Sequence, residues 1–269
     1  MTAIVVPIFN APEATRRCLD ALVATVPADQ PVVLIDDASD DPAIESVLAA
    51  VPEHWYRVRN ARNLGFVASA NLGLAVTATA NVVLLNADTC VTSGWLTAIE
   101  RCAASDKGIA SVTPLTNNGE IASIPEFCRP NPWPENPERW ACACRQAGPP
   151  DYPEVPTAVG FCMFLRRDCL DRIGVFDEAA FGRGYGEEND WCLRATADGW
   201  RHVLCDDAYV AHQGSASFGP LGIRPGGQAM ETLLARYPDY MERVRAFIDA
   251  DPMAERRHRI IEAYRAAAD

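Results

Sequence analysis

The sequence lacks several features that would place it in large classes of proteins. It has no run of 18 apolar residues and therefore predicts no bilayer-spanning helix. Its first seven residues lack the basic segment of a signal peptide. Its 24 Lys and Arg are outnumbered by 36 Asp and Glu, for a net charge of −12. Because a general nucleic-acid binder normally presents a basic face, we expect no nucleic-acid partner. An anionic ligand stays compatible with this charge, since a metal ion can invert the local electrostatics.

The ten cysteines lack the spacing of a metal site. The chain has no Cys-x-x-Cys pair, and Cys142 and Cys144 have no second pair to complete a zinc centre. We therefore interpret the thiols as reduced, small core residues. Reduced thiols are typical of the cytoplasm, so we expect a cytoplasmic protein.

Glycine is missing from the turn after the first predicted strand, Pro7-Ile8-Phe9-Asn10-Ala11-Pro12. The Gly-x-Gly-x-x-Gly turn of dinucleotide-binding proteins is therefore absent, which argues against a nicotinamide or flavin cofactor. The same turn lacks the glycine-rich, arginine-containing loop that a sugar nucleotidyltransferase would show there. Any nucleotide in this protein must be held by other groups.

Apolar runs and helical patterns alternate about five times in the first 113 residues. The run Val82-Val83-Leu84-Leu85 predicts a strand buried on both faces. This alternation predicts an α/β fold with a mainly parallel sheet flanked by helices. We expect strands at 3–9, 31–35, 55–58, 82–85 and 109–112, and helices at 12–25, 44–50, 66–78 and 94–104.

Residues 114–156 contain ten prolines and predict a long irregular excursion. After it we expect strands at 158–165, 200–204 and 208–211, and helices at 168–173, 187–198, 229–248 (with a possible break at Pro238) and 253–268. We divide the chain into a domain of residues 1–228 and a C-terminal helical extension of residues 229–269. Within the domain, residues 1–113 form the predicted nucleotide-binding half and 114–228 the acceptor-binding half. Residues 114–156 and 214–228 are the expected determinants of sugar and acceptor choice.

Polar side chains follow three of the predicted strands: Asn10, the pair Asp36 and Asp37, and Asp88. Neighbouring strands lie about 4.8 Å apart, and open α/β sheets bind ligands at the carboxyl ends of their strands. These side chains should therefore converge on one cleft. They could hold a nucleoside and, beyond it, a metal-bound diphosphate.

Six motifs together make the chain similar to one known family. They are Val6-Pro7-Ile8-Phe9-Asn10, Asp36-Asp37-Ala38-Ser39, Asn63-Leu64-Gly65-Phe66, Asn71-Leu72-Gly73, Asn86-Ala87-Asp88 and Gly186-Glu187-Glu188-Asn189-Asp190-Trp191-Cys192-Leu193-Arg194-Ala195. Their order and spacing resemble family 2 glycosyltransferases over roughly residues 3–213, most closely the rhamnosyltransferase-like branch of bacterial surface polysaccharide synthesis. The resemblance implies a Rossmann-like GT-A fold, a divalent metal and an inverting transfer.

The resemblance also implies roles for individual residues. Asp88 matches the metal-binding last position of the family's Asp-x-Asp motif, while Asn86 replaces its first carboxylate. His212 is a candidate further ligand, or else a structural histidine. With diphosphate and water, this donor set suits Mn²⁺ or Mg²⁺. The expected nucleotide-binding residues are Pro7, Phe9, Asn10, Asp37, Asn63, Gly65, Asn71 and Asn86.

The Gly186–Ala195 motif implies the catalytic base. Glu188 matches that position, with one methylene more than the usual aspartate. Glu187 is expected to bind acceptor. Trp191 is either a core residue or an acceptor platform. We interpret Asp190 and Arg194, four residues apart, as an ion pair on the helix surface. Asp37 is favoured over Asp36 for the nucleoside, although this turn could instead be a helix cap for residues 41–50.

These observations predict a metal-dependent inverting glycosyltransferase that uses a UDP- or dTDP-sugar and a hydroxyl of a glycan or lipid-linked acceptor. A sugar nucleotidyltransferase and a non-catalytic nucleotide-sugar binding module are the alternatives. A lipid-linked acceptor would bring the protein to the inner face of the membrane. The arginines of residues 256–259 form either a solvated helix face or a peripheral membrane contact.

Overall fold

The computed structural model describes residues 1–214 and 227–267. Most of the Gly-, Pro- and Ser-rich stretch predicted at 214–227 lies outside these residues, as does the last residue of the helix predicted at 253–268. No helix in the described part of the chain is both long and apolar enough to cross a bilayer.

Eight strands of the described residues form one sheet in the order β3-β2-β1-β4-β7-β6-β8-β5. Parallel pairing joins β3 to β2, β2 to β1, β1 to β4, and β6 to β8. Only β7 and β5 run antiparallel to their neighbours within this described sheet, so the prediction of a mainly parallel sheet is confirmed. The strands are β1 (Thr2–Ile8), β2 (Val32–Asp36), β3 (Tyr56–Arg59), β4 (Asn81–Leu85), β5 (Thr89–Val91), β6 (Ile109–Leu115), β7 (Cys162–Leu165) and β8 (Arg201–His212).

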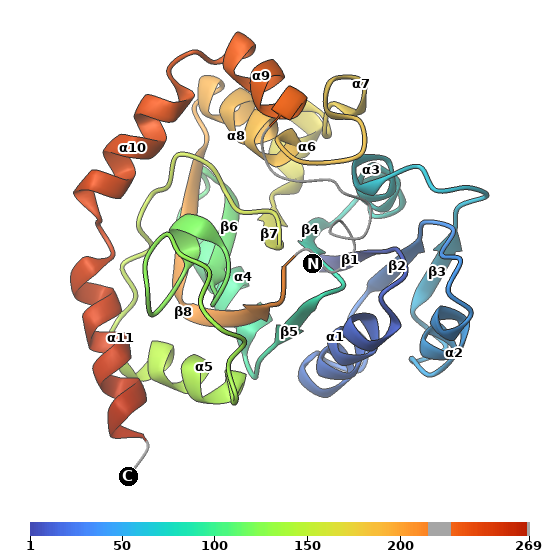
Figure 1. Ribbon diagram of the computed structural model, residues 1–269, viewed down its shortest axis with the longest axis horizontal. Coiled ribbons are helices and arrows are strands. Elements are labelled where there is room, and N and C mark those ends of the chain that lie inside the picture. The colour runs from blue at the N-terminus through green and yellow to red at the C-terminus, as the bar shows by residue number, and fades with distance from the viewer. Residues whose placement is uncertain (215–226, 268–269) are drawn as a thin grey trace.

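Helices cover both faces of the sheet (Figure 1). Helices α1, α2, α4 and α5 share one core cluster, and α3, α6 and α8 share the other. Helices α10 and α11 run along one edge of the molecule in Figure 1, and α9 lies beside α8. The helices are α1 (Pro12–Thr25), α2 (Ala43–Ala49), α3 (Phe66–Val76), α4 (Trp95–Ser105), η1 (Glu120–Ala122), α5 (Pro137–Gln146), α6 (Arg167–Ile173), α7 (Glu178–Phe181), α8 (Glu187–Ala197), α9 (Gly227–Arg236), α10 (Tyr240–Ala250) and α11 (Ala254–Ala266).

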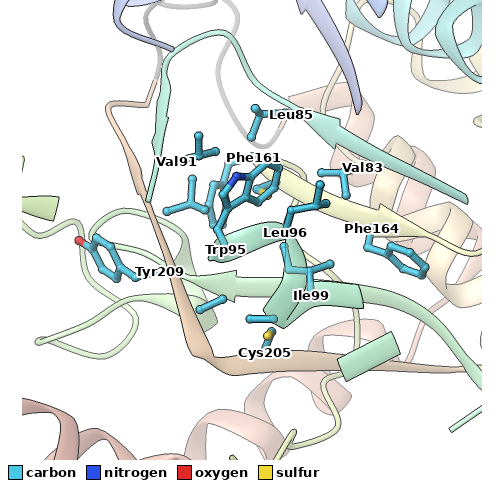
Figure 2. Packing of buried hydrophobic residues seen from close by; sticks show 14 of the residues in the cluster. Val83, Leu85, Val91, Trp95, Leu96, Ile99, Phe161, Phe164, Cys205 and Tyr209 are labelled. Carbon is cyan, nitrogen blue, oxygen red and sulfur yellow. The ribbon is translucent and has the colours of Figure 1, made fainter. Parts of the chain in front are cut away.

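Strand β4 is buried on both faces, as its apolar run predicts. Val83 and Leu85 join the cluster beneath α1 and α4, while Val82 and Leu84 join the cluster beneath α3. Figure 2 shows Leu85 close to the Trp95 ring, which is only 1% exposed. Burying each such side chain contributes about 1.5–3 kcal/mol, so β4 is a firm base for the residues that follow it.

Several predictions of secondary structure were incomplete. The strands expected at 200–204 and 208–211 are one strand, β8, that runs through buried Asp206 and Asp207. The proline-rich excursion contains a helix, α5, whose N-cap Asn136 accepts a hydrogen bond from the Arg139 amide. Short strand β5 was not predicted, and β7 covers only the second half of residues 158–165. The break at Pro238 is confirmed, because it separates α9 from α10.

Two surface interpretations were wrong in part. Arg256 is 1% exposed and pairs with buried Asp206 at 2.7 Å, so it belongs neither to a solvated face nor to a membrane contact. Asp190 does pair with Arg194, at 2.8 Å, but its side chain is completely buried rather than on the helix surface. The ten cysteines, all within the described residues, are free thiols, seven of them buried.

Candidate active site

The carboxyl ends of β1, β2, β4 and β8 border a cavity of about 330 Å³. Asp88 follows β4 and Glu188 lies in the first turn of α8, and both line this cavity although a hundred positions separate them. The structure brings together ten predicted site residues on the cavity wall: Pro7, Phe9, Asp37, Asn63, Gly65, Asn86, Asp88, Glu187, Glu188 and His212.

Asp88 and His212, the two metal ligands predicted from the sequence, lie close to one another on the cavity wall. The Nε2 atom of His212 lies 3.5 Å from Oδ1 of Asp88. Its Nδ1 atom lies 2.6 Å from the carbonyl oxygen of Asn118, which must accept, so Nδ1 carries a proton. Burial would lower the pKa of His212, but the hydrogen bond and charge of Asp88 outweigh burial and raise it.

Asn86 occupies the position where the family motif would carry a carboxylate. The backbone N–H of Asn86 donates to the Phe161 carbonyl at 2.9 Å, and the backbone carbonyl of Asn86 accepts from the Thr89 hydroxyl at 2.8 Å. These bonds hold the turn between β4 and β5. The side-chain Oδ1 of Asn86 is buried and has no hydrogen-bond partner among the described residues. A buried, unpaired acceptor is costly, and this one lines the cavity, so it is suited to a ligand donor or cation.

Asp37 holds together the loop that follows β3. Its carboxylate accepts hydrogen bonds from the amides of Leu64 and Gly65, each at 2.8 Å, and from the Asn60 side chain at 2.7 Å. The predicted alternative, a helix cap, is not seen: the N-cap position of α2 is Pro42, and the nearby Asp41 side chain accepts from the Ala43 amide at 2.9 Å. Asp37 thus shapes the cavity wall and borders it.

Three predicted site residues do not line the cavity. The side-chain oxygen of Asn10 accepts from the Asp40 and Asp41 amides, both at 3.0 Å. Asn71 pairs through its side chain with the backbone of Phe176, at 3.0 and 3.1 Å. Trp191 is fully buried, and its indole donates to the Gly174 carbonyl at 3.0 Å, so the core alternative describes it.

Glu187 and Glu188 begin α8 after Gly186, which adopts a left-handed conformation with φ of 90°. Burial raises the pKa of Glu188 to about 7. Burial and the neighbouring Glu188 charge raise the pKa of Glu187 well above its usual range. Each carboxylate has one buried oxygen without a hydrogen-bond partner among the described residues. A carboxylate with a pKa near neutrality can exchange a proton with a bound hydroxyl.

Several wall residues were not predicted from the sequence. Asn118 and Glu120 follow β6 at the same edge of the sheet, and Glu120 has a left-handed φ of 48°. Arg183 donates to the Asn63 side chain and closes over Gly65. The polar segment Asn117-Asn118-Gly119-Glu120 after a strand is the signal that could have found the first two. This segment falls within the irregular excursion predicted at residues 114–156 and was not singled out from the sequence.

The structure is an α/β fold with a cavity at the carboxyl edge of its mainly parallel sheet. The family model "Glycosyl transferase family 2" matches residues 3–174, and the chain belongs to this family. It is a glycosyltransferase of GT-A fold.

Two mycobacterial relatives are similar in sequence. The uncharacterised proteins Rv1525 of Mycobacterium tuberculosis (strain H37Rv) and Mb1552 of Mycobacterium bovis are each 27% identical to this chain over 217 residues. Each alignment covers 78% of this chain and 73% of the relative. Because both relatives are uncharacterised, the similarity to them does not indicate a substrate.

Three solved structures share the fold. GalNAc-T7 with UDP, GalNAc and Mn²⁺ has a TM-score of 0.65 at 14% identity, and the match covers 98% of this chain and 54% of that one. The mannosyltransferase PcManGT of Pyrobaculum calidifontis, with GDP-Man and Mn²⁺, has a TM-score of 0.57 at 17% identity, over 99% and 74%. Staphylococcus aureus TarS 1–349 with UDP-GlcNAc has a TM-score of 0.56 at 14% identity, over 85% and 60%. This chain thus spans about half of GalNAc-T7.

Proposed function

We propose that this protein is a metal-dependent, inverting glycosyltransferase that moves a sugar from a nucleoside-diphosphate sugar to an acceptor hydroxyl. The observation that carries the proposal is the shared cavity of Asp88 and Glu188. One residue suits a cation and a diphosphate, and the other suits proton transfer. Sugar transfer needs both residues at one site, Asp88 at the diphosphate of the donor and Glu188 at the acceptor hydroxyl.

The donor end is the wall formed by β1, β2 and β4. Pro7, Phe9 and Asp37 border the space proposed for the nucleoside, and residues 1–113 supply this half. Similar folds were solved with UDP, GDP-Man or UDP-GlcNAc, which supports a nucleotide-sugar donor. We propose a UDP- or dTDP-sugar.

Asp88 and His212 are the residues that would hold a divalent cation, Mn²⁺ or Mg²⁺. The fit rests on Nε2 of His212 and Oδ1 of Asp88, which lie 3.5 Å apart, and on the unpaired Oδ1 of Asn86. Binding of a cation would displace the proton that Nε2 shares with Asp88. No group of three His, Cys, Asp or Glu side chains gathers as a metal site among the described residues, so diphosphate and water would complete the shell. When bound, the cation would neutralise charge on the departing diphosphate.

Glu188 is the proposed base. It would accept the proton of the acceptor hydroxyl while that oxygen attacks the anomeric carbon opposite the diphosphate, so the configuration inverts. Positive charge on the sugar ring grows as the bond to diphosphate loosens, as in glycoside hydrolysis. Glu187 would contact the acceptor or support the loop before α8.

The acceptor end is assigned to the half formed by residues 114–228. A hydroxyl of a glycan or lipid-linked carrier in bacterial surface polysaccharide synthesis is our proposed acceptor, with the rhamnosyltransferase-like branch as the proposed subgroup. A lipid-linked acceptor would bring the enzyme to the inner face of the membrane.

A screen of UDP- and dTDP-sugars with Mn²⁺ or Mg²⁺ tests this proposal, with release of nucleoside diphosphate as the readout. We expect turnover with one donor class that stops on chelation of the metal and in Asp88→Ala. Pyrophosphate release from a nucleoside triphosphate and a sugar phosphate would instead favour a nucleotidyltransferase. Tight donor binding by calorimetry without hydrolysis or transfer to any acceptor would favour a binding module.

A further inference from the structure

One wall of the cavity comes from helices beyond the part matched by the family model. Ala229, Met230 and Leu233 of α9 and Tyr240 and Val244 of α10 line it. These side chains belong to a small apolar cluster with Phe181 and Leu193. This cluster is separate from the two core clusters on the faces of the sheet. Since the family model ends at residue 174, this wall is a feature of the C-terminal helices.

The wall is fixed to the helix that carries the proposed base. Arg236 of α9 contacts Asp190 of α8 and Asp177, each at 2.8 Å. The Tyr237 hydroxyl donates to Asp190 at 3.2 Å. Because Asp190 is completely buried and lies two residues after Glu188, these contacts hold α9 against the first turn of α8. Figure 1 shows α9 lying along α8.

The apolar wall and Glu188 line the same cavity. Burial is the main cause that raises the pKa of Tyr240 to about 12, and the charge of nearby Glu188 adds to it. The Tyr240 hydroxyl lies 3.5 Å from the Thr157 hydroxyl, and both residues line the cavity. An acceptor whose hydroxyl reaches Glu188 could therefore extend within the same cavity to Met230 and Val244.

The chemistry of this wall selects among acceptor groups. Beyond Tyr240 its side chains are Ala, Met, Leu and Val, which offer no hydrogen-bond donor or strong acceptor. A second sugar placed there would leave hydroxyls unpaired, at about 1–3 kcal/mol for each buried group. An alkyl chain loses no hydrogen bond and gains about 0.8 kcal/mol for each buried CH₂.

We infer that the α9–α10 wall is an acceptor subsite for an apolar aglycone, an alkyl or isoprenoid chain attached to the sugar that presents its hydroxyl to Glu188. This inference rests on the proposed function, since it places the acceptor at Glu188. Met230 and Val244, both partly buried, are the side chains that would contact the apolar chain of the acceptor.

Binding of two glycosides tests the subsite without knowledge of the natural acceptor. The probes are methyl and n-octyl β-D-glucopyranoside, each below its critical micelle concentration, titrated calorimetrically in the presence of UDP and Mn²⁺. We expect wild type to bind the octyl glycoside at least about tenfold more tightly, which corresponds to burial of about two methylenes. The shape-conserving variant Met230→Gln/Val244→Thr should reduce this ratio at least about threefold.

A matched double variant provides the control. Met241→Gln/Val23→Thr makes the same chemical changes at side chains that are 43% and 49% exposed and do not line the cavity. It should keep the wild-type ratio. A wild-type ratio near one, an unchanged ratio in the lining variant, or an equal loss in the control would overturn the subsite.

Donor turnover on the same proteins separates this inference from the proposed function. Turnover of a nucleotide sugar without any octyl preference would overturn the subsite and leave the proposed function standing. An octyl preference that the lining variant alone loses, in a protein that turns over no donor, would support the subsite and contradict the proposed function.

Discussion

The Nε2 atom of His212 faces Oδ1 of Asp88 across 3.5 Å, while Nδ1 of the same ring meets the Asn118 carbonyl at 2.6 Å. The carbonyl fixes the tautomer, and the ring stacks on Phe161 with centroids 5.1 Å apart. A histidine oriented in this way by a second hydrogen bond is typical of a metal ligand. The pairing also joins two distant segments, the turn after β4 and the end of β8.

Replacement of His212 by Ala should weaken Mn²⁺ binding. Loss of an outer-shell partner commonly costs 10–100-fold in metal affinity, so removal of a direct ligand should cost at least about tenfold. Electron paramagnetic resonance of Mn²⁺ titrated into the protein with UDP measures this affinity. His258→Ala is the control, because the His258 side chain of α11 is exposed and pairs only with Glu262 among the contacts described for it, at 3.2 Å. Equal affinities in the two variants would remove His212 from the metal site.

Glu188→Gln should abolish transfer and keep donor binding. Loss of a general base lowers the rate by roughly 10²–10⁴-fold, whereas the amide keeps the size of the side chain. Single-turnover transfer and UDP affinity, measured together, separate the two effects. Glu242→Gln, an exposed change on α10, should retain the wild-type rate. Near-normal transfer by Glu188→Gln would move the base to another residue.

The pH profile should report the raised pKa of Glu188, about 7 against a usual 4.5. A base acts in its deprotonated form, so kcat/KM should rise about tenfold per pH unit below 7 and level off above it. An ordinary glutamate would give a flat profile from about pH 5.5 upward. The residual rate of Glu188→Gln should lack this limb. A flat wild-type profile through pH 6–8 would count against Glu188 as the base of the free enzyme.

Gly65→Ala should lower the stability of the protein and weaken nucleotide binding at the donor end of the cavity. Gly65 has a φ of +94°, and an added Cβ would lie 2.9 Å from Cα of Arg183. Gly199 has a similar φ of +89° with nothing within 4 Å of the added atom, so Gly199→Ala isolates the backbone strain. We expect Gly65→Ala to lose about 1–3 kcal/mol more stability in urea, the usual cost of overpacking, and to bind UDP more weakly. Equal stability and equal UDP affinity would show that Arg183 does not pack there.

Locally encoded elements could be predicted from the sequence. The four apolar residues of 82–85 are sufficient to indicate a buried strand, and α8 begins after Gly186 with three acidic residues in its first turn. Acidic side chains there complement the helix dipole. Asp88 follows the first element and Glu188 lies in the second, but their placement in one cavity was predicted from the resemblance to family 2 glycosyltransferases and not from these local patterns.

Long-range partners could not be predicted. Asp206 and Asp207 divide an apolar pattern and predict a break between two strands. In the structure, Arg256 and Arg101 pair with them, so β8 continues through both. Nothing near residue 206 in the sequence indicates an arginine fifty positions later. Asn10 and Asn71 carry polar groups that suit a ligand, but their side chains are hydrogen-bonded to backbone atoms of Asp40 and Phe176 instead.

Crystals grown with UDP and Mn²⁺ and measured at the manganese absorption edge test the central claim most directly. The account predicts an anomalous peak in contact with Asp88 and His212, with the diphosphate against it and Glu188 across the same cavity. A manganese peak away from Asp88, or a nucleotide bound outside this cavity, would contradict it.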